Sequence, residues 1–133
     1  MEEYSNALGC LSTFFASEDP NIVIWAFQGG FFPNILEIIN TGLGQDKKHA
    51  LFALSNIAAG SDKEPIRALL DETLLMERVI ELMNHTEVTL MGEASWVIAN
   101  AINCADKRTL VQFTSFMEGD LINALVMKLR DLP

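Results

Sequence analysis

The stretch EASWVIANAIN (Glu93–Asn103) decides the fold, because its pattern occurs twice earlier in the chain. It aligns without a gap on HALFALSNIAA (His49–Ala59), 44 residues earlier, and that stretch aligns on NALGCLSTFFA (Asn6–Ala16), 43 residues earlier again. In each stretch apolar residues recur three and four positions apart, which is the spacing of a helix with one buried face. The sequence therefore predicts the same long helix three times.

A second apolar segment follows the same period, as FFPNILEIINTG, LLMERVIELMNHT and DLINALVMKLRDL. No run alternates apolar and polar residues for long enough to predict a sheet. Helical repeats of about 40–47 residues are typical of HEAT and armadillo arrays. We therefore predict an all-α protein, a right-handed α-solenoid with about two complete repeats.

Glycines mark the expected breaks between helices. Gly29–Gly30 separates two apolar segments, Gly42 and Gly44 form the next turn, and residues 60–62 combine a helix-ending glycine with two N-cap residues. Each complete unit should contain a short, a medium and a long helix, and the last partial unit a short and a medium helix. The predicted organisation of residues 1–133 is a partial repeat over 1–17, complete repeats over 20–60 and 62–105, and a partial repeat over 106–131.

Both ends of the array are expected to present apolar side chains. These are Phe14 and Phe15 at one end and Leu125, Val126 and Leu129 at the other. Solenoids normally finish with polar capping repeats, and the sequence contains no obvious cap. A mean hydropathy of +0.22 fits such uncovered faces. We therefore expect either part of a longer array or a chain that forms a homo-oligomer through its ends.

Composition excludes several classes of partner. The chain has 133 residues, enough for one domain with its own core, and a net charge of −9. Nucleic acid is not expected as a partner, since phosphate binding needs clustered cations. No apolar run reaches about 18 residues, and MEEYSN contains no apolar signal region. We expect no membrane partner and a reducing intracellular location, where Cys10 and Cys104 pack as small buried side chains.

Glu93, Trp96 and Asn100 lie on the polar side of the last long helix, and we call them the complete row. At about 100° per residue, they fall within an arc of about 60°. A Lys or Arg stem gains apolar and cation–π contact on an indole, and an amide can hold a peptide backbone. A carboxylate attracts the cation. The complete row therefore predicts a site for a basic peptide.

Structural alternatives stay open for the same residues. The indole of Trp96 could pack against a neighbouring helix and bind nothing. Asn56 and Asn100 could form hydrogen bonds between repeats, and this is compatible with a bound peptide. Trp25 has no polar companions at helical spacing, so we expect it in the core or between repeats.

ALFALSNIAAG and EASWVIAN resemble the third helix of armadillo repeats in the importin alpha family of nuclear-import adaptors, through the pattern W-x-x-x-N. The resemblance covers nearly the whole chain, is faint over residues 1–40, and is greatest to the later repeats around the smaller, C-terminal binding pocket. It implies an armadillo solenoid whose concave surface binds Lys/Arg-rich nuclear localisation signals, in the cytoplasm and nucleus.

All three residues of the complete row match the family's motif, so the resemblance implies that each of them contacts the peptide. In the preceding long helix Asn56 matches, while Phe52 stands in the tryptophan place and His49 in the acid place. We call these three residues the partial row. The first long helix retains none of the motif. The Lys/Arg-rich segment by which the family docks on importin beta is not in this sequence, so we expect no importin-beta binding.

No catalytic, metal or cofactor site is expected. His49 and His85 stand apart from any cysteine or carboxylate pair at metal-ligand spacing, and no glycine-rich phosphate-binding motif occurs. We therefore expect a binding protein that is not an enzyme. The alternative to an import adaptor is an armadillo scaffold with a degenerate peptide groove, which works through its exposed repeat ends.

Overall fold

The computed structural model describes residues 2–16, 19–60 and 63–130. These residues contain helices and no strand, so the prediction of an all-α protein is confirmed. The helices are α1 (Glu2–Ala16), α2 (Pro20–Gln28), α3 (Phe31–Thr41), α4 (Gly44–Ala59), α5 (Lys63–Leu70), α6 (Thr73–Leu82), α7 (Val88–Cys104) and α8 (Lys107–Arg130).

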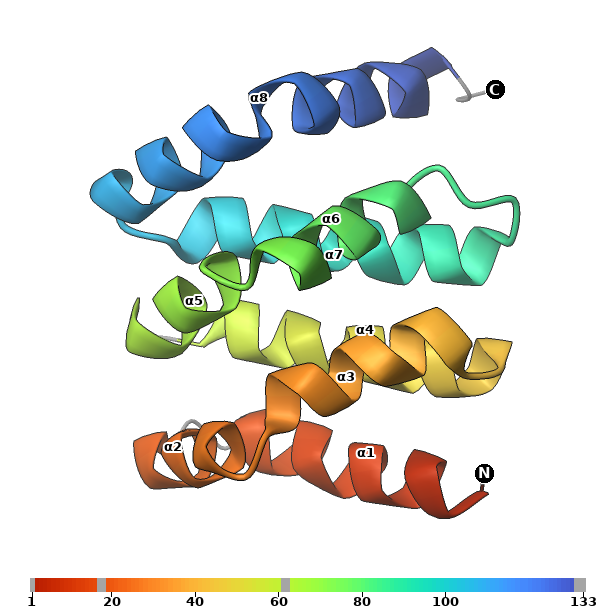
Figure 1. Cartoon of the computed structure of the whole chain (residues 1–133), viewed down its shortest axis with the longest axis vertical. Coiled ribbons are helices and arrows are strands. Elements are labelled where there is room, and N and C mark those ends of the chain that lie inside the picture. Colours follow the sequence, from red (N-terminus) through yellow and green to blue (C-terminus); the bar gives the residue numbers. More distant parts are fainter. Residues whose placement is uncertain (1, 17–18, 61–62, 131–133) are drawn as a thin grey trace.

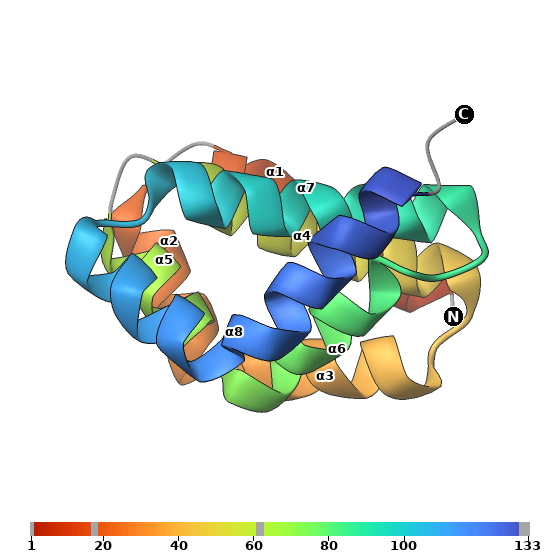
Figure 2. The same cartoon turned by 90° about the horizontal axis from the view of Figure 1, so that it is seen from above.

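The helices stack in two layers along the long axis of the molecule. The long helices α1, α4 and α7 lie side by side in one layer, and the shorter helices α2, α3, α5 and α6 form the other (Figures 1 and 2). Helices α2–α4 and α5–α7 are two successive units of three helices. Helix α8 lies against α5 and α6 at the far end of the stack.

Local sequence explains where the helices of the first unit begin and end. The carboxylate of Asp19 accepts a hydrogen bond from the backbone N–H of Asn21 (3.0 Å), which caps α2. Gly30 has a φ of 83°, a conformation open to glycine at no steric cost, and it turns the chain from α2 into α3. At Gly42 a β-carbon would lie 2.6 Å from the carbonyl oxygen of Ile38, so the turn into α4 has no room for a side chain.

The core lies between the two layers and runs through both units. Its large, fully buried side chains are Ile35, Ile39, Leu51, Leu54, Ile66, Leu69, Leu75, Met76, Val79, Met83, Leu90 and Ile98. The long helices also bury small residues, Ala50, Ala53, Ala58, Ala94 and Ala101. Small residues let neighbouring long helices approach closely, and this explains the many alanines in the repeated pattern.

Two predictions about aromatic residues were wrong. Phe15 was expected to be uncovered, but it is 2% exposed and meets the ring of Phe31 edge-on at 5.1 Å. Its neighbour Phe14 is exposed as predicted, because adjacent helical residues point about 100° apart. Trp25 was expected in the core or between repeats but is 67% exposed, since α2 is short and buries its other side around Val23.

Helix α8 also differs from the prediction of a short and a medium helix. It is one helix of 24 residues, which lies across the end of the stack (Figure 2). The only glycine inside it is Gly119, and a single glycine costs a helix about 1 kcal/mol without ending it. Val126 is exposed as predicted, whereas the side chains of Leu125 and Leu129 lie outside the described part.

The cysteines are less buried than expected. Cys10 on α1 is exposed and Cys104 at the end of α7 is half-buried, and neither is in a disulfide. In the described ranges, no single helix is long and apolar enough to cross a membrane. Only the bent pair Asn21–Gln28 and Phe31–Thr41 reaches the required length and composition, and in the solenoid Phe31, Phe32, Ile35 and Ile39 are buried.

Candidate functional site

The complete row lies on α7, with its indole directed away from the core. Trp96 is 59% exposed, and Glu93 and Asn100 are half-buried on either side of it. The opposite side of α7 carries the buried residues Ala94, Ile98 and Ala101. Burial of Trp96 against a neighbouring helix, the structural alternative, does not occur. The structure thus offers an open indole face with an acid and an amide on the same side of one helix.

The partial row lies on α4, which packs along α7 in the long-helix layer. Phe52 is 47% exposed, while His49 and Asn56 are half-buried. The Nε2 atom of His49 lies 3.2 Å from the Nε2 atom of Gln45, within hydrogen-bonding distance. Its Nδ1 atom is buried and has no hydrogen-bond partner among the described residues. The partial row therefore offers a smaller ring than the complete row and no carboxylate.

The asparagines of both rows connect the long helices. Asn100 donates its side-chain amide to the main-chain carbonyl of Ser55 on α4 (3.3 Å). Asn56 donates in the same way to the carbonyl of Ser12 on α1 (2.9 Å). The alternative of hydrogen bonds between repeats is therefore confirmed. Each of these bonds uses one amide hydrogen, and an asparagine has a second hydrogen and a carbonyl oxygen for a peptide backbone.

Helix α1 has no ring at the position of Trp96 and no amide at the position of Asn100. Thr13 stands where Asn56 stands on α4, and its hydroxyl donates to the carbonyl of Gly9 within the same helix (3.0 Å). Gly9 itself occupies the place of the ring. The arrangement of acid, ring and amide is therefore complete on α7, partial on α4 and absent on α1.

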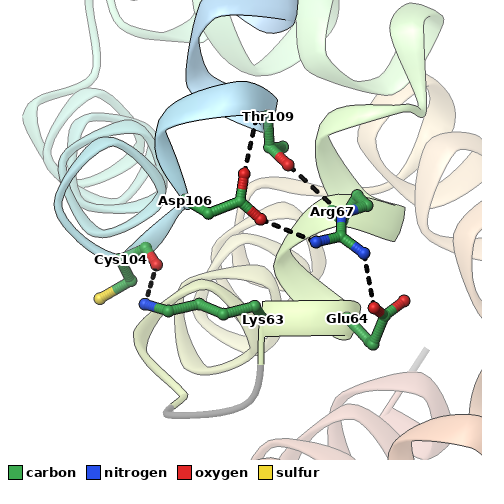
Figure 3. A network of polar contacts seen from close by, with 6 residues as sticks. All are labelled: Lys63, Glu64, Arg67, Cys104, Asp106 and Thr109. Carbon is green, nitrogen blue, oxygen red and sulfur yellow. Dashed lines mark hydrogen bonds and ion pairs between the residues drawn. The ribbon is translucent and has the colours of Figure 1, made fainter.

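A polar network at the start of α8 was missed by the sequence reasoning (Figure 3). Arg67 on α5 donates to Asp106 (2.7 Å), to Thr109 (3.3 Å) and to Glu64 (2.5 Å). Lys63 donates to the carbonyl of Cys104. Together these bonds join α5 to the start of α8 and the end of α7. An aspartate directly before the first residue of a helix is an N-cap signal, which could have revealed part of the network.

The carboxylate of Asp106 caps α8 and is held in its charged form. It accepts a hydrogen bond from the backbone N–H of Thr109 (2.8 Å). This bond, followed by the bond from Arg67, holds the pKa of Asp106 well below its usual range. In return, the hydrogen bond to Asp106, with the charge of Glu64, raises the pKa of Arg67. The arrangement is a structural clamp, because every group in it is paired within the protein.

A cavity of about 420 Å³ lies away from both rows, at α3 and the turn into α4. Asn34, Glu37, Ile38, Thr41 and Leu43 contribute to its lining. Nothing in the sequence had singled out this place. Among the residues that the structure describes, no three His, Cys, Asp or Glu side chains lie close enough together to hold a metal ion.

Comparison with known proteins identifies the fold. No protein-family model matches the sequence, and no curated protein matches it. A designed armadillo repeat protein, solved in complex with the peptide (KR)4, is similar in structure, with a TM-score of 0.74 and 23% sequence identity. The similarity covers 96% of this chain and 51% of the designed one, so the chain spans about half the length of that protein. The fold is an armadillo-type α-solenoid.

Proposed function

We propose that the layer of long helices binds an extended peptide that contains lysine or arginine, with the complete row as its main contact. The observation that carries this proposal is the 59% exposure of Trp96 between Glu93 and Asn100. Because much of the indole surface is exposed to solvent, the aliphatic part of a lysine or arginine side chain in a peptide can pack against it. The similar designed protein was solved with the peptide (KR)4, which supports a basic ligand.

The three side chains would have separate roles. The cation of the peptide would lie on the ring of Trp96, which contributes about 0.5–2 kcal/mol. Glu93 would add attraction that acts more on the association rate than on the affinity, because it is partly exposed. The second amide hydrogen and the oxygen of Asn100 would hold the peptide backbone. Phe52 would give a weaker second pocket, since phenylalanine binds cations less well than tryptophan.

A titration with (KR)4 tests this proposal. We expect saturable binding by calorimetry at low salt, and a Trp96→Ala protein should bind roughly two- to thirtyfold more weakly, from the cation–π range of about 0.5–2 kcal/mol. Trp25→Ala is the matched control, because that indole is exposed in the other layer and should leave binding unchanged. A (GS)4 peptide should not bind. Equal losses for the two tryptophan variants would contradict the proposal.

At the biological level we propose a nuclear-import adaptor that works without catalysis in the cytoplasm and nucleus. The resemblance of the two long helices to importin alpha motifs supports this role. Excess chain should compete with the endogenous adaptor and slow the import of a cargo with a Lys/Arg-rich signal into nuclei of permeabilised cells. Trp96→Ala should remove that competition, and undiminished competition by this variant would exclude the role.

A second candidate function is a scaffold whose peptide surface has degenerated. It is favoured by the partial row, where His49 replaces the acid and Phe52 replaces the tryptophan. It is also favoured by the amide bonds of Asn56 and Asn100, which are already used between helices. In that case (KR)4 would not bind the folded protein at low salt, and the same titration therefore separates the two candidates.

A further inference from the structure

The cavity at α3 lies on a face whose counterpart on α6 contacts the preceding unit. Helix α6 repeats α3 with a shift of 44 residues, and the buried positions coincide in the pairs Phe31 and Leu75, Phe32 and Met76, Ile35 and Val79, and Ile39 and Met83. By the same shift, Arg78 corresponds to Asn34, and Leu82 corresponds to Ile38. Both Asn34 and Ile38 line the cavity.

On α6 this face packs against the second helix of the unit before it. Arg78 donates to the side-chain oxygen of Asn40 on α3 (2.9 Å), and Leu82 is buried. On α3 the corresponding face has a cavity of about 420 Å³. The cavity therefore lies where the second helix of a preceding unit would pack. We call this surface of α3 and the α3–α4 turn the seat.

Helix α8 of a second copy has the length to occupy this seat, and it stands in its own chain where the first two helices of a further unit would stand. It lies against α5 and α6, where the first two helices of a next unit would lie, and its 24 residues are about as many as residues 63–82 of those two helices and their turn. Exposed residues recur every three or four positions along α8 from Arg108 to Val126 and form one outward stripe. The stripe includes Val111 and Ile122, each 54% exposed. The described residues of this stripe face solvent.

Charge at the two ends is complementary as well. The seat includes the exposed carboxylate of Glu37, and the sequence places Lys128 and Arg130 in the last turns of α8. Since the whole chain carries a charge of −9, two copies repel each other in most orientations. An orientation that brings the cationic end of α8 to an acidic seat is favoured over the others.

We infer that two copies of this chain associate head to tail, with the outward stripe of α8 of one copy seated against α3 and the α3–α4 turn of the next. Helix α8 then supplies the first two helices of a unit whose third helix is α1 of the second copy. The 15 residues of α1 match the 16 of α4 and the 17 of α7. Such a contact joins two different surfaces, so association continues beyond a dimer as concentration rises.

Two substitutions at exposed positions separate the surfaces. Leu43→Glu places a charge in the seat, and Ile122→Glu places one on the stripe of α8; both side chains are more than half exposed, so the fold is retained. Leu74→Glu on α6 is the matched control, because Leu74 is equally exposed outside both surfaces. Circular dichroism confirms that each variant is folded before its mass is measured.

Analytical ultracentrifugation over low micromolar to several hundred micromolar protein gives the test. The mass of the unmodified chain and of Leu74→Glu should rise from 14.8 kDa beyond that of a dimer. Leu43→Glu and Ile122→Glu should each associate at least tenfold more weakly. An equal mixture of these two variants should form a particle of two chains and nothing larger, because one intact seat and one intact stripe remain.

Three outcomes would overturn the inference. The unmodified chain could stay at 14.8 kDa at every concentration. Either variant alone could still associate as the unmodified chain does, which would indicate a contact between two like surfaces. The mixture could fail to form the two-chain particle. Neither substitution touches the complete row, so (KR)4 titration of the same variants keeps failure here distinct from failure of the proposed function.

Discussion

Asn100 on α7 donates its amide to the carbonyl of Ser55, the residue directly before Asn56 on α4. The bond from Asn56 to Ser12 has the same offset, because Ser12 directly precedes Thr13 on α1. The asparagine of each unit thus donates a hydrogen bond to the main chain of the long helix before it. This arrangement gives the asparagines a structural role that does not depend on a ligand.

Replacing Asn100 should therefore lower the stability of the free protein. We expect Asn100→Ala to reduce the free energy of unfolding in urea by about 0.5–1.5 kcal/mol, the net value of one hydrogen bond. Asn103→Ala is the control, because Asn103 is exposed one turn further along α7. If both variants unfold at the same urea concentration, the bond to Ser55 does not stabilise the stack.

Restoring the missing side chains of the partial row should strengthen peptide binding. We expect Phe52→Trp with His49→Glu to lower the dissociation constant for (KR)4 by less than about thirtyfold, because a whole cation–π contact contributes at most about 2 kcal/mol and Phe52 already supplies part of it. The reverse pair, Trp96→Phe with Glu93→His, should weaken binding in the same range. Calorimetry at low salt measures both. Unchanged affinity in the first double variant would mean that the peptide does not reach α4.

The repeat made most of the fold predictable from the sequence. The apolar period and the glycines at 29–30, 42, 44 and 60 define the helices, because a buried helical face and a tight turn each demand particular residue types. The exposure of Trp96 followed from its polar neighbours on one face. These features depend on residues that lie close together in the sequence.

The features that the sequence did not reveal depend on contacts between distant residues. Phe14 and Phe15 are chemically the same, and only the position of α3 decides which of them is buried. Trp25 is exposed because none of the described helices covers that side of α2. The bond between Arg67 and Asp106 joins residues 39 positions apart. Local patterns contain no information about such pairs.

The clamp at Asp106 should make stability depend on pH. Because the folded pKa of Asp106 is depressed, its contribution is present above the ordinary aspartate value near about 4 and is lost as pH falls through the folded pKa. Asp106→Asn should therefore lower the melting temperature most at neutral pH, and the difference from the unmodified protein should shrink as the pH is lowered below about 4. Asp71→Asn, an exposed carboxylate after α5, is the control. A constant difference across this range would assign the effect to packing.

Two glycines should respond in opposite directions to alanine. Gly30 has a φ of 83°, where an L-residue costs roughly 1–2 kcal/mol, so Gly30→Ala should destabilise the protein by about that amount. Gly9 lies within α1 with no atom within 4 Å of a β-carbon, so Gly9→Ala should stabilise it by about 0.4–1 kcal/mol. Urea unfolding measures both. A Gly30→Ala protein as stable as the unmodified one would contradict the left-handed turn between α2 and α3, and a destabilised Gly9→Ala protein would contradict the free space at Gly9.

Urea unfolding of a Gly42→Ala protein tests the effect of lack of space where the backbone is not strained. Its φ of −73° suits any residue, but a β-carbon there would lie 2.6 Å from the carbonyl oxygen of Ile38 and 3.2 Å from the side chain of Ile38. Because that carbonyl belongs to the last turn of α3 and accepts a bond from Gly42 itself (2.7 Å), it cannot move without loosening the helix end. Gly42→Ala should therefore destabilise the protein despite its permissive φ. Stability at or above that of the unmodified protein would show that the turn relaxes freely.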